Sequence, residues 1–160
     1  MEPTTASPDQ STLVATSPVN PPGGLRISIV PHDHVDVVWE QVAPLLKRAT
    51  DRSGGRYAIG DVYSLIAEDR CHLWIGFAPG MKIVGAATSV FNVYPGGKWL
   101  TAQFLGSDDM SECFDFLEVF ERWARDNDCV GIEFSGRSGW ARVLKKHGYD
   151  EYHRFFQKDL

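Results

Sequence analysis

The sequence has few cysteines, no long apolar run and no excess of positive charge, and each absence excludes a class of protein. Its three cysteines, Cys71, Cys113 and Cys129, are an odd number without Cys-x-x-Cys spacing, which argues against a disulfide framework or zinc site and favours a reducing compartment. No apolar run approaches the roughly 18 residues of a membrane helix, and the N-terminal residues lack the pattern of a secretory signal. The net charge of -5 predicts no general attraction to nucleic acid or to an anionic membrane.

What is present is the composition of one globular domain, preceded by a different segment. The 160 residues are 43% hydrophobic and 12% aromatic, enough for a single buried core. Residues 1–24 combine Ser and Thr with Pro3, Pro8, Pro18, Pro21 and Pro22, and bury too little apolar surface to offset the entropy lost on ordering. We expect residues 1–24 to be a flexible arm or an arm bound to another protein, and residues 25–160 to be the folded domain.

Apolar periodicity divides residues 25–160 into strands and helices. It predicts strands at 25–31, 72–77, 81–94, 98–105, 130–135 and 152–156, and helices at 35–52, 59–69, 110–127 and 138–147. Asp33 or Asp36 can cap the first helix, and Pro44 should kink it. A strand–helix–strand crossover near the C-terminus needs a parallel pair, so the sequence predicts an α/β domain with a mixed sheet.

The most distinctive segment runs from Phe134 to Tyr149, with the sequence FSGRSGWARVLKKHGY. It predicts a strand end, a glycine-flanked turn, a short basic helix and a glycine stop followed by an aromatic residue. This order resembles the closing strand and helix of the GCN5-related N-acetyltransferase (GNAT) family, in the Gly-Arg-x-Gly-Trp variety common in tailed bacteriophages and their hosts. Over residues 25–160 the resemblance implies a GNAT-like fold, in which a mixed central sheet with splayed parallel strands at 98–105 and 130–135 is flanked by helices.

The resemblance also implies a cofactor and a place for it. Family members transfer an acetyl group from acetyl-CoA to an amine and hold the pantetheine arm between the splayed strands. They bind the pyrophosphate on a turn that opens the next helix, and the matching cofactor-binding positions here are Gln103, Leu105, Gly106 and Ser107. The family's last small residue is replaced by Asp108, followed by Asp109. Because such carboxylates cap free N–H groups and repel a phosphate, we expect a self-capped helix.

A second turn is an alternative cofactor-binding site. The run Gly136, Arg137, Ser138 and Gly139 opens the last helix, and its guanidinium can bind a phosphate through two hydrogen bonds. The other interpretation is a structural strand-to-helix turn with Ser138 as the helix N-cap. The sequence leaves both interpretations open.

Few residues are candidates for the acid and base of an acetyl transfer. The resemblance implies a Tyr as general acid four residues before the terminal glycine, but Leu144 occupies that position. Tyr149 is a neighbouring phenol, which can instead pack as the aromatic residue after the helix stop. Glu133, on the second splayed strand, is the candidate base or an ordinary polar strand residue. The His32-Asp33-His34 run lacks further spaced ligands, so no metal is predicted.

Two functions from different classes remain open. The first is an acetyl-CoA-dependent N-acetyltransferase. The second is a catalytically degenerate GNAT-fold protein, such as a bacteriophage virion or structural component that binds another protein through residues 1–24. The expected location is the cytoplasm of a bacterial host cell or the virion.

Overall fold

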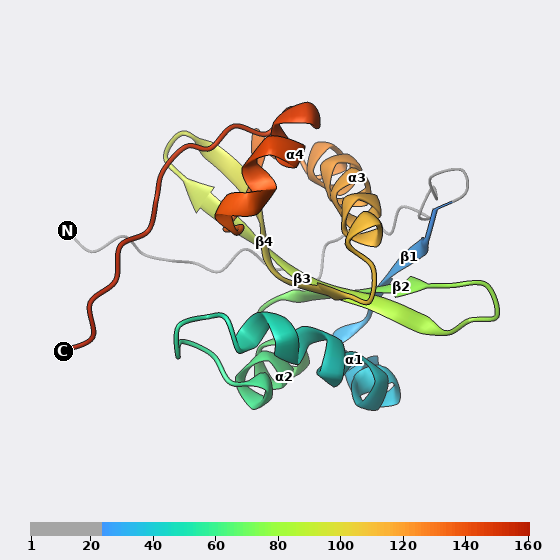
Figure 1. Ribbon diagram of the computed structural model, residues 1–160. Coiled ribbons are helices and arrows are strands. Elements are labelled where there is room, and N and C mark those ends of the chain that lie inside the picture. The colour runs from blue at the N-terminus through green and yellow to red at the C-terminus, as the bar shows by residue number, and fades with distance from the viewer. Residues whose placement is uncertain (1–23) are drawn as a thin grey trace.

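The computed structural model describes residues 24–160, which fold around a five-stranded sheet (Figure 1). The predicted arm lies outside the described residues except for Gly24. The strands are β1 (Arg26–Val30), β2 (His72–Phe77), β3 (Ile83–Tyr94), β4 (Gly97–Ser107) and β5 (Gly131–Phe134), and they keep this order across the sheet. β1 to β4 pair antiparallel, whereas β5 is parallel to β4. The predicted mixed sheet is therefore confirmed.

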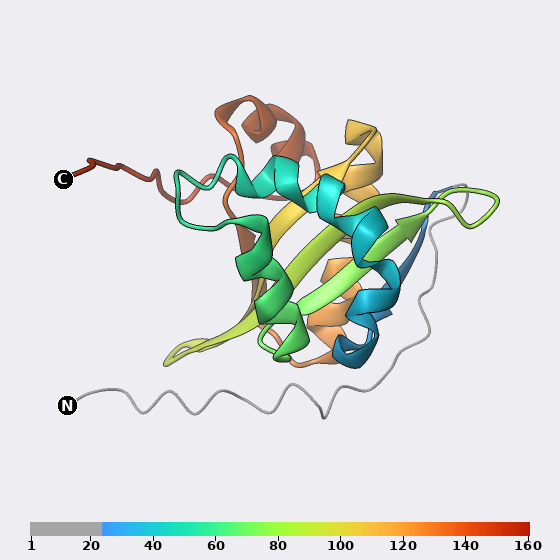
Figure 2. The ribbon, with the colours of Figure 1, turned by 90° about the horizontal axis from the view of Figure 1, so that it is seen from below.

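Helices cover both faces of the sheet (Figures 1 and 2). α1 (Val35–Thr50) and α2 (Ile59–Ala67) lie on one face, and α3 (Met110–Asp126) and α4 (Ala141–Lys146) lie on the other. Short 3-10 turns, η2 (His32–His34) and η3 (Ser138–Trp140), precede α1 and α4. Within residues 24–160, no helix combines the length and apolarity needed to cross a membrane.

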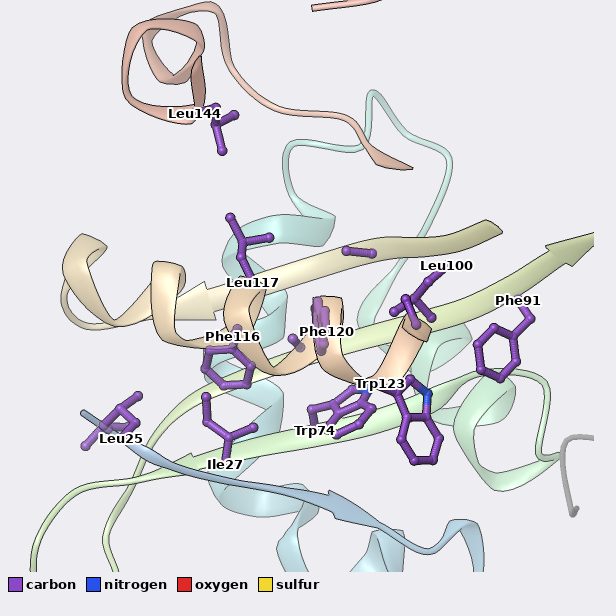
Figure 3. Close-up of a cluster of buried hydrophobic side chains, with 14 residues drawn as sticks. Leu25, Ile27, Trp74, Phe91, Leu100, Phe116, Leu117, Phe120, Trp123 and Leu144 are labelled. Atoms are coloured by element: carbon purple, nitrogen blue, oxygen red, sulfur yellow. The ribbon is translucent and has the colours of Figure 1, made fainter. Parts of the chain in front are cut away.

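Each face of the sheet has its own apolar core. On the α3 side, Phe116 and Phe120 lie one turn apart and are fully buried, and the ring of Phe120 meets that of Trp74 from β2 at 5.4 Å (Figure 3). On the α1 side, Val42 and Leu46 are buried in the same cluster as α2. The helical spacing in the sequence therefore places each helix against its own face.

Two local predictions are wrong. Residues 152–156 form no strand, because strand geometry needs a paired neighbour and this segment has none among residues 24–160. Neither acidic residue caps α1, whose N-cap has no side-chain hydrogen bond. Asp33 hydrogen-bonds with His34 at 2.8 Å, and Asp36 accepts from the Tyr63 hydroxyl at 2.5 Å.

A polar cluster is enclosed in the core on the α3 side. His72 is 4% exposed, and its Nδ1 lies 3.0 Å from the Ser89 hydroxyl oxygen, which also accepts from Trp74 Nε1 at 2.9 Å. The ring centroids of Phe91 and Trp123 lie 5.0 and 6.2 Å from the centroid of the imidazole ring. Burial lowers the pKa of His72 from 6.5 to about 4, so the imidazole is neutral in the folded protein at neutral pH.

We predict that His72 makes the fold sensitive to acid. The unfolded chain binds a proton at this residue below pH 6.5, but the folded chain does so only near pH 4. The free energy of unfolding should therefore fall by about 3 kcal/mol between these pH values. Urea unfolding at several pH values measures this change in the free energy of unfolding. It compares the wild type with His72→Gln and with His153→Gln, a control at an exposed site. A pH dependence unchanged in His72→Gln would contradict the prediction.

Candidate active site

The parallel strands β4 and β5 diverge after a short pairing. Their register runs from Trp99 opposite Gly131 to Ala102 opposite Phe134, and β4 then continues to Ser107. Residues 104–107 still pair with β3 on one side, but within residues 24–160 they have no strand on the other. The divergence leaves backbone N–H and C=O groups of β4 available to a ligand.

A β-bulge lies where the parallel pairing ends. Ser89 of β3 pairs with Ala102 and Thr88 pairs with Phe104, so Gln103 is an extra residue in β4. Ala102 consequently packs in the α3-side core and Phe104 in the α1-side core. A bulge bends its strand and interrupts pairing, which accounts for the divergence from β5.

Gln103 carries a buried acceptor at this bulge. Its Oε1 atom is buried and has no hydrogen-bond partner among the described residues. A buried acceptor left unpaired costs about 1–3 kcal/mol, so a ligand N–H group that reached it would recover this loss. The α1–α2 loop also reaches the bulge, since the Tyr57 ring meets that of Phe104 at 5.2 Å.

Gly106, predicted in the pyrophosphate turn, is required for helix packing. A Cβ atom at this position would lie 2.0 Å from the carbonyl oxygen of Leu45 in α1. The close approach occurs one residue after Pro44, which lies inside α1. Leu105, the neighbouring candidate, packs partly buried against the α3-side core. Both residues therefore have structural roles that would explain them without a phosphate.

The N-terminus of α3 is self-capped. The Asp109 carboxylate accepts from the backbone N–H of Ser111 at 2.8 Å and from its hydroxyl at 2.9 Å, and these bonds lower the pKa of Asp109. The N–H group of Asp108 is directed to the Val84 carbonyl at 3.3 Å, and its carboxylate pairs with Arg48 at 3.1 Å. These groups already use N–H donors that a phosphate would need.

Ser107, the last candidate of this turn, is also engaged within the protein. Its hydroxyl hydrogen-bonds the Glu112 carboxylate and accepts from the backbone N–H of Asp109 at 3.4 Å. Asp108, Asp109 and Glu112 thus bring three carboxylates to the start of α3. Like charges repel one another at short range, so these carboxylates make the turn unsuited to a pyrophosphate.

Glu133 lies at the vertex of the diverging strands, on the face opposite α3. Its neighbours Ile132 and Phe134 pack into the α3-side core, so Glu133 points toward the face of α1 and α2. It pairs across the strands with Thr101, one position before the pairing ends. The strand alternation in the sequence therefore places this carboxylate beside the opening between β4 and β5.

Two donors hold one oxygen of Glu133. Tyr94 and Thr101 donate from their hydroxyls to Glu133 Oε1 at 2.8 and 2.9 Å, and Asn92 Nδ2 donates to the Thr101 hydroxyl oxygen at 2.7 Å. Hydrogen bonding to the carboxylate raises the pKa of Tyr94, so its phenol remains protonated. The other carboxylate oxygen, Oε2, has no hydrogen-bond partner among residues 24–160 and is available to a substrate.

Tyr149 lies on the other face of the sheet. Its ring packs against Phe134 at 5.3 Å and its hydroxyl donates to Glu121 of α3 at 2.9 Å. Burial, followed by this hydrogen bond, raises the pKa of Tyr149. Glu121 lines a hollow of about 310 Å³ beside α3 and α4, together with Phe114, Asp115, Leu117, Glu118 and His147. The structure therefore does not bring Tyr149 and Glu133 to one site.

The turn at residues 136–139 is exposed and separate from the Glu133 network. Ser138 is not the helix N-cap, contrary to one interpretation of the sequence: Ser138 and Gly139 lie inside η3, whose N-cap is Arg137 and which has no side-chain cap bond. The Arg137 carbonyl accepts from the backbone N–H of Trp140 at 2.9 Å, and Gly136 precedes this N-cap residue. Leu144, one turn into α4, is buried in the α3-side core. These contacts account for the segment structurally, and its binding role stays a prediction.

The sequence did not reveal the partners of Glu133. Tyr94 is 39 positions away along the chain, and only the registers of β3 with β4 and of β4 with β5 bring the two together. Thr101 was within reach of sequence reasoning, because it lies on a predicted neighbouring strand. The bulge at Gln103 has no marker in the sequence, since neither glycine nor proline occupies it.

Known proteins resemble this chain in structure. No protein-family model and no curated protein matches the sequence. A probable acetyltransferase has a TM-score of 0.63 at 13% identity over 84% of this chain and 96% of that one. The aminoglycoside acetyltransferase meta-AAC0020 from an uncultured soil metagenomic sample, solved in complex with sisomicin, has a TM-score of 0.64 at 10% sequence identity. This match covers 87% of this chain and 98% of that one. A GNAT family acetyltransferase from Staphylococcus aureus has a TM-score of 0.59 at 12% sequence identity, over 86% of this chain and 99% of that one.

At these identities the likeness establishes the fold. The protein has the GNAT fold, with its mixed sheet and diverging parallel strands, as the segment from Phe134 to Tyr149 indicates. The bacteriophage variety of that segment stays a prediction.

We predict that Gly106→Ala destabilises the domain. The added methyl group would collide with the α1 backbone, and such overpacking typically costs about 1–3 kcal/mol or more. Gly96→Ala is the matched control, because a Cβ there meets nothing within 4 Å. Urea unfolding measures both variants. Equal stability of the two would show that α1 does not pack against β4 in this way.

Proposed function

We propose that this protein is an N-acyltransferase in which Glu133 receives the acceptor amine at the vertex of β4 and β5. The observation that carries the proposal is the carboxylate held through one oxygen by Tyr94 and Thr101, with the other oxygen unengaged within residues 24–160. The acetyltransferase neighbours support the same class of reaction. Fold alone does not establish activity, so the proposal rests on this arrangement.

The residues fit acetyl-CoA in one part of the site and not in another. The β4 backbone beyond Ala102 and the unpaired Gln103 Oε1 suit an amide-bearing arm such as that of pantetheine. The start of α3 does not suit the pyrophosphate, because its N–H donors are used and its carboxylates repel it. We therefore expect acetyl-CoA to bind weakly, through the strand opening. When bound, it would supply the acetyl group as an activated thioester.

The chain's own contribution is to hold the amine and accept its proton. An amine is mostly protonated at neutral pH and must lose a proton to become a nucleophile. Glu133 Oε2 is the atom that would accept this proton. Tyr94 and Thr101 fix the carboxylate through Oε1 and thereby limit its rotation. Leu144 is buried in the core and carries no proton that it could donate to a leaving thiolate.

We predict that Glu133→Gln lowers acetyl transfer about 100-fold or more, the usual loss on removing a general base. Thiol release from millimolar acetyl-CoA with spermidine, an aminoglycoside and a lysine peptide as acceptors measures it. Glu118→Gln, an exposed carboxylate on α3, is the control and should retain full activity. Equal rates in Glu133→Gln and the wild type would exclude Glu133 as the base. No release with any acceptor would favour the non-catalytic alternative.

We also predict that Asp108→Asn/Asp109→Asn tightens the binding of acetyl-CoA. Asparagine preserves the N-cap of α3 while two negative charges are removed. Removing the repulsion should tighten the dissociation constant about tenfold. Calorimetric titration measures this, with Asp126→Asn at the opposite end of α3 as the control. Unchanged or weaker binding in the double variant would show that these carboxylates do not limit acetyl-CoA binding.

A further inference from the structure

The last helix presents a basic surface to solvent. Residues 134–149 contain four Lys and Arg side chains and no carboxylate, although the whole chain has a net charge of -5. All four are exposed, and they are Arg137, Arg142, Lys145 and Lys146. Arg142, Lys145 and Lys146 have the spacing i, i+3 and i+4, which places them on one face of α4. We refer to these three residues as the basic face.

The basic face has no acidic partner in the described part of the chain. Within residues 24–160, no ion pair joins it to a carboxylate. Exposed cations elsewhere are paired, as Lys47 is with Asp51 at 2.8 Å and Arg48 with Asp108 at 3.1 Å. The charge of the basic face is therefore available to a partner.

Helix stability does not explain the basic face. The helix dipole favours cations in the last turn, which accounts for Lys145 and Lys146, but it disfavours a cation in the first turn, where Arg142 lies. Like charges at spacings of three and four residues also repel one another along a helix. A surface that costs its own helix stability indicates a role in binding negative charge.

The basic face borders one side of the opening between β4 and β5. Because these strands are parallel, α3 and α4, which follow them, begin at the same end of the sheet. Both helices lie on the face opposite α1 and α2 (Figure 1). Glu133 points to the α1 and α2 face, where the acceptor amine is received in the proposed function. A donor that enters from the other face would pass between the start of α3 and α4.

The two sides of this entrance have opposite charge. Asp108, Asp109 and Glu112 lie at the start of α3, and the basic face lies on α4. A large acidic partner can contact α4 from outside, and repulsion by the α3 carboxylates would fix its orientation. Only an uncharged arm then has to enter the opening, where the β4 backbone and Gln103 Oε1 suit its amide groups.

We propose that the acyl donor is an acidic carrier protein, which binds the basic face and bears the acyl group as a thioester on a phosphopantetheine arm. This inference rests on the N-acyltransferase function proposed above. In the transfer, the carbon–nitrogen bond of the amide forms as the carbon–sulfur bond breaks. The amine proton passes to Glu133, and the thiolate stays on the carrier's arm and takes a proton from water. Such a donor has no pyrophosphate to place on the start of α3.

A comparison of three acetyl donors with the same acceptor amines tests the proposal. The donors are acetyl-CoA, acetyl-phosphopantetheine and the acyl carrier protein of bacterial fatty-acid synthesis loaded with an acetyl group. The last two have the same arm and differ in the protein. We expect kcat/KM for the carrier to exceed that for acetyl-phosphopantetheine about tenfold or more, because opposite charge speeds the encounter. Higher ionic strength should reduce this advantage.

Charge reversal tests the basic face itself. Arg142→Glu/Lys145→Glu/Lys146→Glu should lower kcat/KM for the carrier about tenfold or more relative to that for acetyl-phosphopantetheine. The milder Arg142→Gln/Lys145→Gln/Lys146→Gln should have an intermediate effect. Arg26→Glu/Lys82→Glu/Lys158→Glu makes the same change of charge at exposed positions away from α4 and should preserve the ratio of the two donors. Circular dichroism checks that all three variants are folded.

The outcomes separate this proposal from the function on which it rests. Transfer from acetyl-CoA or acetyl-phosphopantetheine with no gain from the carrier would overturn the carrier and leave the acyltransferase in place. A loss in the basic-face variants that is equal for both donors would also overturn it, because the face would then serve the acceptor. Absence of transfer from all three donors would overturn the acyltransferase itself.

Discussion

The extra residue in β4, Gln103, is the constraint on which the site depends. Because it shifts the register against β3 by one residue, Ala102 and Phe104 pack on opposite faces of the sheet. The bulged strand stops pairing with β5 at this point. The same irregularity thus leaves β4 backbone unpaired, leaves the Gln103 side-chain oxygen without a partner, and places Glu133 at the vertex of the opening.

The two ends of this opening differ in electrostatic character. At the vertex, the hydroxyl groups of Tyr94 and Thr101 donate to one oxygen of the Glu133 carboxylate. At the far end, carboxylates occupy the start of α3 and use its N–H groups. The vertex is suited to a cation such as an ammonium group, whereas the far end is unsuited to an anion.

Sequence reasoning succeeded where the cause is local. Helical and strand periodicity predicted all five described strands and all four α-helices, because each of them buries one face and its apolar residues recur at the matching spacing. It also predicted a sixth strand, at 152–156, which does not form. The cap at Asp109 followed from an acidic residue at a helix start. The misses have non-local causes. The bulge is a register relation between β3 and β4, and Tyr94 meets Glu133 only through that sheet. The prediction of a strand at 152–156 was wrong because alternating polarity shows which side chains share one face of a strand. It does not show whether a neighbouring strand is present to pair with it.

We propose that a thioester ligand binds along the opening between β4 and β5 and not on the start of α3. Hydrogen exchange of backbone amides, measured with and without millimolar acetyl-CoA, distinguishes the two positions. We expect slower exchange in residues 103–107 and no change in residues 109–112. Protection of residues 109–112 with residues 103–107 unchanged would place the ligand on the start of α3 instead, and a complete absence of protection would exclude binding at either position.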